Sequence, residues 1–166
     1  MKRLLIALIL LIPFWGMAQD NSPIDKLFNK YANKEGFSTV NISGKLLNFA
    51  SKMDDSNSKE SAMLDKISGI RILSVEDKDL NKGLNFYKEL EADGFFKNNS
   101  YESLMEVTDK NQVVRFYGRS GEKGKLSELL LVVGGEDNTL ISIRGVISPE
   151  DIGKITGSLD LGVKTK

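Results

Sequence analysis

An alternation of apolar and polar residues that begins at Tyr101 restricts the fold of this chain more than any other feature. A period of two places successive side chains on opposite faces of a β-strand. Two such stretches, 101–109 and 112–120, are separated only by Lys110 and Asn111. We therefore predict an antiparallel hairpin with a two-residue turn.

The register of this hairpin follows from the turn. The resulting pairs are Met105 with Phe116, Val107 with Val114, and Glu106 with Arg115. One face of the hairpin is therefore apolar, whereas the other carries an ion pair. We expect the apolar face to be packed and the polar face to be in water.

The chain then continues as two further strands. Residues 118–125 form a polar, glycine-containing loop that lacks the glycine, lysine and hydroxyl spacing of a phosphate-binding P-loop. The apolar run 129–133 shows no alternation, so we expect its strand to be covered on both faces and to be central. After a turn at 134–138, the last strand covers 139–147. The four strands predict an antiparallel meander.

Two segments carry the pattern of a capped helix start. Ser22 is a suitable cap, Pro23 suits the first helical position, and Asp25 completes a capping box. We expect this helix to end at Gly36. The final helix repeats the pattern with Ser148, Pro149 and Asp151.

The rest of the first half alternates between strand and helix patterns. Strands are predicted at 38–43 and 70–76, where β-branched residues are frequent. Apolar residues at helical spacing predict helices at 44–52, from the polar turn 54–58 to Gly69, and at 77–92. Gly83 is unfavourable inside the last of these helices, because glycine costs about 1 kcal/mol relative to alanine there.

These elements predict an α+β fold. Its antiparallel sheet has a four-strand C-terminal meander, and the helices pack mainly on one face, the apolar one. The strands of the first half are joined through helices, so parallel pairing between them remains an alternative. We expect residues 19–166 to form a single domain, since no internal linker is present.

The first residues have the composition of a secretory signal peptide. Lys2 and Arg3 precede an apolar stretch at 4–15, which is short for a membrane span, and small residues follow up to Ala18. We predict a signal peptide at residues 1–18, with cleavage after Ala18, and export to the periplasm or cell envelope. An uncleaved membrane anchor is the alternative, although no second apolar segment follows.

The amino-acid composition excludes several classes of chemistry. The chain has neither cysteine nor histidine, so disulfides, thiol nucleophiles, histidine triads and most zinc or copper sites are ruled out. Removing Lys2 and Arg3 with the signal peptide lowers the basic residues from 23 to 21, against 23 acidic ones. A nearly neutral chain without basic clusters argues against nucleic acid as a partner. We expect no cofactor, no metal and no membrane span after removal of the signal peptide.

Nearly all of the predicted mature chain resembles one known family. The resemblance rests on four stretches: FNKYANKEGFSTVNISGKLL, GIRILSVED, SLMEVTDKNQVVRFYGR and LSELLLVVGGEDNTLISIRGVISPEDIGKI. The chain is similar to an uncharacterised family of small exported proteins of Bacteroidetes-type bacteria, which is known as a domain of unknown function (number forty-two fifty-two). The resemblance implies export and a shared fold, and some members are encoded near envelope-responsive sigma factors. It offers no catalytic residue to transfer.

Two kinds of catalysis remain open to a chain without histidine and cysteine. Paired carboxylates can hydrolyse glycosides, and the candidates are Glu102, Glu106 and Glu128, although Glu106 faces Arg115. A desolvated lysine can activate a serine, and the loop around Gly121 holds Ser120, Lys123, Lys125 and Ser127. A flexible loop would keep its lysines solvated and protonated. We therefore expect no enzyme activity.

The polar face of the sheet is the stronger candidate for a site. Arginine and tyrosine on a rigid sheet can bind a carboxylate, a glycan or a protein through forked hydrogen bonds and flat contacts. The candidate binding residues are Glu106, Arg115, Tyr117, Arg119, Ser142 and Arg144. The sequence thus predicts a non-catalytic binding module with an envelope protein or glycan as partner. Its alternatives are a carboxylate-based hydrolase of envelope polymers and an accessory or sensor component of an envelope stress response.

Overall fold

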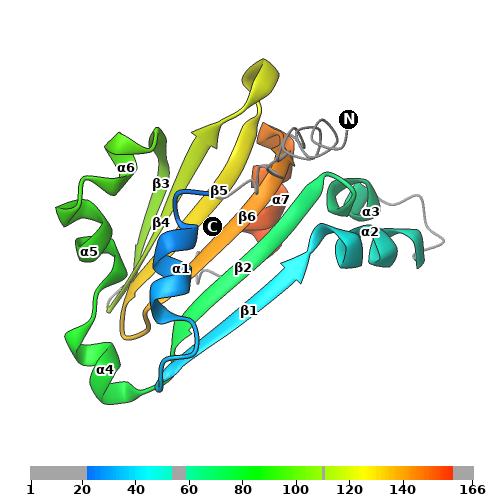
Figure 1. Ribbon diagram of the computed structural model, residues 1–166. Coiled ribbons are helices and arrows are strands. Elements are labelled where there is room, and N and C mark those ends of the chain that lie inside the picture. Colours follow the sequence, from blue (N-terminus) through cyan, green and yellow to red (C-terminus); the bar gives the residue numbers. More distant parts are fainter. Residues whose placement is uncertain (1–21, 54–58, 110, 159–166) are drawn as a thin grey trace, which may run out of the picture.

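The computed structural model describes residues 22–53, 59–109 and 111–158. It contains a six-stranded antiparallel sheet with the strand order β1-β2-β6-β5-β4-β3 (Figure 1). The strands are β1 Phe37–Ser43, β2 Ile67–Val75, β3 Tyr101–Asp109, β4 Gln112–Ser120, β5 Leu126–Gly135 and β6 Thr139–Ile147. This arrangement confirms the α+β class and the four-strand meander. The first two strands are antiparallel to their neighbours, so the parallel pairing left open above does not occur.

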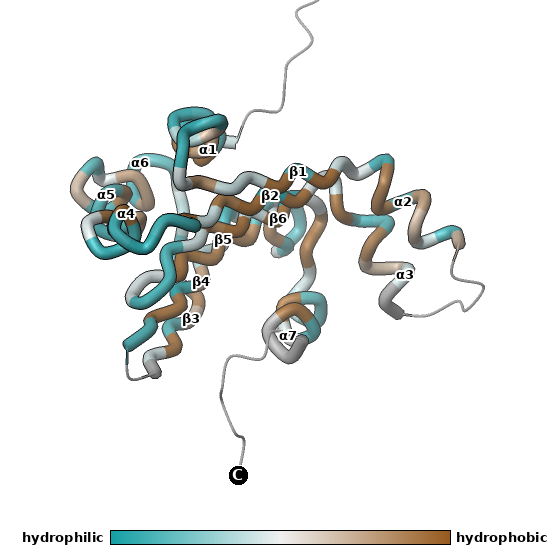
Figure 2. Tube along the Cα trace, turned by 90° about the horizontal axis from the view of Figure 1, so that it is seen from below, coloured by the Kyte–Doolittle hydropathy of each residue, from teal (hydrophilic) through white to brown (hydrophobic). Residues whose placement is uncertain are grey.

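The helices pack against both faces of this sheet. They are α1 Asp25–Tyr31, α2 Gly44–Met53, α3 Lys59–Leu64, α4 Lys78–Gly83, α5 Phe86–Ala92, α6 Phe95–Asn98 and α7 Pro149–Ser158, with a 3₁₀ turn at Glu122–Gly124. Figure 2 shows α1, α5 and α6 on one face, which we call the α1 face, and α7 on the opposite α7 face. Helices α2 and α3 lie at the end of β1 and β2.

The predicted hairpin has the expected register. In β3 and β4, Met105 pairs with Phe116 and Glu106 with Arg115. A bulge between Ser103 and Met105 shifts the pairing in the first part of β3. The prediction for β5 is also confirmed, because this strand is central and most of its side chains are buried.

Helices cover most of the face that carries Glu106 and Arg115, which contradicts our expectation, although the Glu106 side chain itself is half-exposed. The same face presents large apolar side chains from the central strands, and these pack against α1, α5 and α6 to form a hydrophobic core. The sheet residues of this core are Leu73, Tyr101, Tyr117, Leu130, Val132 and Leu140. The α7 face holds a second core around Phe116, Leu129 and Leu131. When a sheet presents apolar side chains on both of its faces, both faces must be covered.

Several predicted helix boundaries are wrong for identifiable reasons. The helix expected at 77–92 is interrupted after Gly83, because Leu84 is extended and the Asn85 side chain caps α5 by accepting the Lys88 N–H. The helix expected to reach Gly69 ends earlier, since β2 begins at Ile67 and pairs with β6.

The two predicted capping boxes behave differently. At the start of α7, Asp151 accepts the Ser148 N–H at 3.0 Å, and Pro149 is the first helical residue, as predicted. At α1, Asp25 accepts the Ser22 N–H at 3.1 Å, but the Ser22 hydroxyl donates to Glu128 instead of capping the helix. Helix α1 also ends at Tyr31 rather than at Gly36. The buried carboxylate of Glu128 thus competes with the helix for the serine.

The predicted signal peptide, residues 1–18, lies outside the described residues. Among the helices that the structure describes, none has the length and apolar character required to cross a membrane.

Candidate functional site

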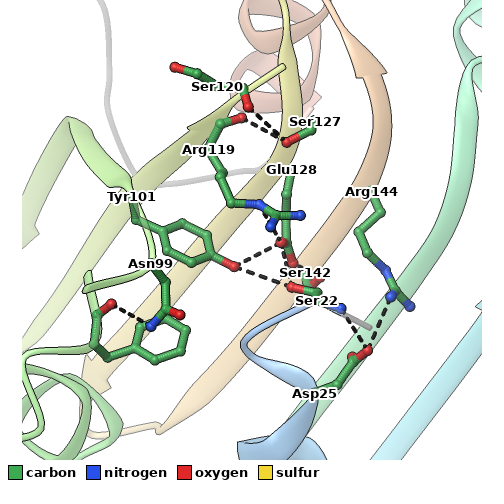
Figure 3. Close-up of polar contacts among 11 residues, drawn as sticks. Ser22, Asp25, Asn99, Tyr101, Arg119, Ser120, Ser127, Glu128, Ser142 and Arg144 are labelled. Atoms are coloured by element: carbon green, nitrogen blue, oxygen red, sulfur yellow. Dashed lines mark hydrogen bonds and ion pairs between the residues drawn. The ribbon is translucent and has the colours of Figure 1, made fainter. Parts of the chain in front are cut away.

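A carboxylate with no exposed surface lies at one end of the α1 face. Glu128 of β5 is fully buried. It accepts hydrogen bonds from the hydroxyls of Ser22 at 2.5 Å, Tyr101 at 2.7 Å and Ser142 at 2.6 Å (Figure 3). Burial and the charge of Glu128 raise the pKa of Tyr101, so its phenol remains a donor. These four residues, the buried carboxylate cluster, join the start of the described chain to three strands.

A second buried carboxylate lies beside this cluster. Asp25 of α1 is within 2.6 Å of an Arg71 nitrogen and 3.2 Å of an Arg144 nitrogen, so it fastens α1 to β2 and β6. The Arg71 guanidinium also lies over the Phe28 ring at 4.5 Å. Both arginines therefore help to hold α1 on the sheet.

A pocket of about 310 Å³ opens at this end of the sheet. It is lined by Lys66, Ser68, Arg119, Ser127, Arg144, Gly145 and Val146, which we call the basic pocket. Three of these side chains are cationic and none is acidic. The volume is at the small end of ligand sites, so it suits one small group rather than a cofactor.

Irregular backbone builds the wall of this pocket. The pairing of β2 with β6 shifts between Ile67 and Gly69, and that of β5 with β6 shifts between Leu126 and Glu128. At the same level Gly145 has a φ of 150°. A Cβ atom on Gly145 would lie 2.2 Å from the Lys66 carbonyl oxygen, so only glycine allows the two backbones to approach.

The cations of the pocket are oriented by carboxylates behind them. Lys66 lies 3.5 Å from Asp151, and Arg119 Nε lies 3.7 Å from Glu128, which exceeds hydrogen-bond distance. Arg119 Nε has no hydrogen-bond partner within the described residues. The Arg119 guanidinium is thus attracted to Glu128 while that nitrogen remains unsatisfied.

The six predicted binding residues fall into two groups. Arg119 and Arg144 line the basic pocket, and Ser142 lies behind it, where it donates to Glu128. Glu106, Arg115 and Tyr117 lie further along the α1 face and do not line the pocket.

The second group serves to hold helices on the sheet. Arg115 Nε donates to Glu106 at 2.7 Å, and its guanidinium lies 3.8 Å from the centroid of the Tyr87 ring. The Tyr117 ring stacks on that of Phe96, with centroids 4.0 Å apart. These contacts fasten α5 and α6 to β4, which leaves little of Tyr117 accessible to a partner.

The residues considered for catalysis do not converge. Glu106 is paired with Arg115, and Glu128 is enclosed by donors. In the loop, Lys123 and Lys125 are exposed, and the Ser127 hydroxyl donates to the Arg119 and Ser120 carbonyl oxygens. No group of three or more acidic side chains within the described residues has the arrangement of a metal site.

A larger pocket, of about 780 Å³, lies at the opposite end of the strands. It mixes acidic side chains with Lys78 and Lys82. Its polar groups already bond to one another, since Asn81 and Asn111 both donate to Glu136. Four acidic residues and two lysines line this pocket, so it does not concentrate cations as the basic pocket does.

Sequence reasoning missed Lys66, Ser68, Gly145 and Val146. They enter the pocket only because β2 pairs with β6, a contact between residues more than 70 positions apart. The one local signal is Gly145, a glycine within a strand pattern, which is typical of a bulge or a close backbone approach.

Comparison with family models matches residues 31–155 to the family described as Domain of unknown function (DUF4252). A comparison with curated proteins and one with solved structures each gave no match. The match agrees with the resemblance that the sequence stretches indicated.

Proposed function

Because this chain belongs to the family described as Domain of unknown function (DUF4252), whose description assigns no activity, we propose its function from the geometry. The protein is an exported, non-catalytic binding module of the cell envelope. Its basic pocket holds a carboxylate or phosphate group carried by an envelope polymer or protein.

The observation that supports this proposal is the charge of the pocket lining. Three cationic side chains converge on one small pocket: Lys66 from the residue before β2, Arg119 from β4 and Arg144 from β6. No acidic side chain lines this pocket. Their own carboxylates lie behind them and fix their positions. Pre-oriented cations bind an anion with little loss of side-chain entropy, and arginine binds carboxylate and phosphate with forked hydrogen bonds.

Binding is favoured over hydrolysis by the state of the carboxylates. A carboxylate hydrolase needs two such groups facing one substrate, one of them able to donate a proton. Glu128 is enclosed by three hydroxyl donors and has no exposed surface, whereas Glu106 is bound to Arg115.

Export is supported by the sequence of the first 18 residues. The mature protein should begin at Gln19, three residues before Ser22 enters the buried carboxylate cluster. Sequencing of the mature N-terminus from cell fractions tests this. A protein that retains Met1 would contradict export.

Anion binding is tested by isothermal titration at low ionic strength with inorganic phosphate, sulfate and glucuronate, and with glucose as a neutral control. We expect the anions to bind, and the affinity to fall as salt is added. R119Q should weaken phosphate binding about tenfold, because it removes hydrogen bonds to a charged group. K66Q should weaken it about two- to fivefold, as expected for a partly exposed charge.

The matched control is K82Q, which removes an exposed lysine at the other end of the molecule. It should leave phosphate binding unchanged. Melting temperatures show whether each variant is folded. Absence of binding by every anion, or equal binding by K66Q, R119Q and the original protein, would contradict the proposal.

A further inference from the structure

The sheet is open, so it has two edge strands, β1 and β3. An edge strand presents unpaired backbone N–H and C=O groups that can pair with another strand. Proteins usually protect such edges with charges, bulges, prolines or covering elements. The two edges of this protein differ in this respect.

The β3 edge carries such protection. A bulge between Ser103 and Met105 interrupts its regular pairing, and Glu102 and Glu106 place negative charge on it. A second β3 strand would bring like charges together, which is unfavourable.

The β1 edge has none of these features. Its seven residues, FSTVNIS, include neither a charge nor a proline. Its pairing with β2 is regular from Phe37 opposite Val75 to Ser43 opposite Gly69. Val40, at the middle of the strand, is 44% exposed. The strand therefore has no bulge and no charge, and its outer side is available for pairing.

Apolar side chains are also exposed just past the end of this strand. Helix α2 begins at Gly44, immediately after β1 ends (Figure 1). Leu46, Phe49 and Met53 lie on one side of this helix and are 57%, 60% and 70% exposed. Such a stripe on a short helix marks an interaction surface, since exposed apolar groups rarely gather without one.

We propose that β1 pairs with β1 of a second copy of this chain, in antiparallel orientation, about a two-fold axis at Val40. This pairing places Val40 opposite Val40 and Ser38 opposite Ile42 of the partner copy. Each sheet face of one copy continues into the same face of the other, because the paired residues have the same parity. The result is a continuous twelve-stranded sheet.

A second copy suits this edge better than an unrelated strand. The central pair is apolar against apolar, and no like charges meet at any position of the uncharged strand. A two-fold contact is closed, since it uses both β1 edges and leaves only the protected β3 edges.

The chain has no cysteine, so a single introduced thiol tests the pairing directly. Opposite residues of antiparallel strands have Cα atoms about 4.5–5.5 Å apart, which is within the range of a disulfide. V40C should form a covalent dimer under oxidised glutathione. L104C is the matched control, because Leu104 is similarly exposed, at 42%, on β3. It should form little covalent dimer, since the proposed pairing keeps the two β3 strands apart.

Sedimentation provides the second measurement. The original protein should form a concentration-dependent dimer, V40K should be monomeric because two lysines would meet at the axis, and L104K should dimerise like the original. A protein that is monomeric at all concentrations would overturn the proposal. So would a disulfide formed preferentially between the V40C and L104C proteins, which would indicate head-to-tail strand addition.

Discussion

Tyr101 donates a hydrogen bond to a carboxylate that has no exposed surface. Replacing it with phenylalanine removes the donor but keeps the ring, so Glu128 loses one of its three hydroxyl partners. We expect Tyr101→Phe to lower the free energy of unfolding by about 1.5–3 kcal/mol, the usual range for a hydrogen bond to a charged group. Urea denaturation at neutral pH measures this change.

Tyr87→Phe is the matched control for that substitution. The Tyr87 hydroxyl donates to Glu91 at the surface, and this bond raises its pKa to about 12. Its loss should cost less than about 0.5 kcal/mol, as for most surface changes. Equal effects of the two substitutions would show that the buried carboxylate cluster contributes nothing special to stability.

Asp151 makes stability depend on pH in the acid range. Burial acts to raise the pKa of this carboxyl group, but hydrogen bonds from Ser148 and the charge of Lys66 outweigh it and lower the pKa overall. A group whose folded pKa is lowered stabilises the protein above its unfolded pKa of about 4, and this contribution is lost as the pH falls.

Asp151→Asn should therefore destabilise the protein most at neutral pH. We expect a loss of about 0.5–2 kcal/mol at pH 7, the range for a helix cap. The difference between the two proteins should shrink at pH 3, where the original carboxyl group gains a proton. A difference that is the same at both pH values would contradict this assignment.

The contacts of single residues could be predicted only where they are local. The Glu106 and Arg115 pair follows from the alternation and from a turn of two residues, and the structure contains it. Asp25 and Arg144 are 119 positions apart, and nothing in either segment indicates the contact. The basic pocket depends on contacts of this second kind.

At the scale of elements, two glycines should respond in opposite ways to the same substitution. Gly83 ends α4 with open space around the position of a Cβ atom and without a positive φ. Gly83→Ala should raise the free energy of unfolding by about 0.4–1 kcal/mol, because alanine restricts the unfolded chain.

Gly145→Ala should instead destabilise the protein by more than about 1 kcal/mol, because of the positive φ and the clash with the Lys66 carbonyl oxygen. It should also weaken phosphate binding, since β2 and β6 would have to separate at the pocket wall. Thermal unfolding of both variants measures the first effect and titration the second. If both substitutions changed the free energy of unfolding in the same direction, the positive φ and close approach at Gly145 would not constrain the backbone.

Strands were predicted more accurately than helices. The period of two and the tight turn specify β3 and β4 locally, and the observed sheet keeps that register. The prediction of one continuous helix at 77–92 is wrong, because apolar spacing alone does not show that the backbone at Leu84 is extended. The capping residue Asn85 was the local signal for this break.

At the scale of the whole molecule, the two covered faces decide where a ligand can bind. The ion pair of the hairpin and the polar residues Ser142 and Arg144 predict a face in water, because they do not show which apolar side chains the neighbouring strands place on the same face. The leucines and valines of β5 and β6 add a second apolar stripe, which recruits α1, α5 and α6. The ends and edges of the sheet remain for recognition, and the basic pocket and β1 lie there.

The central claim is that an anion binds among Lys66, Arg119 and Arg144. The most direct measurement is a titration of the isotope-labelled protein with inorganic phosphate, followed by amide chemical shifts in two-dimensional NMR spectra. We predict that the shifts concentrate at Ser68, Arg119, Ser127, Gly145 and Val146 and that K66Q reduces them. Shifts centred on residues 76–82 and 135–137 at the opposite end, or no shifts in any region, would contradict the claim.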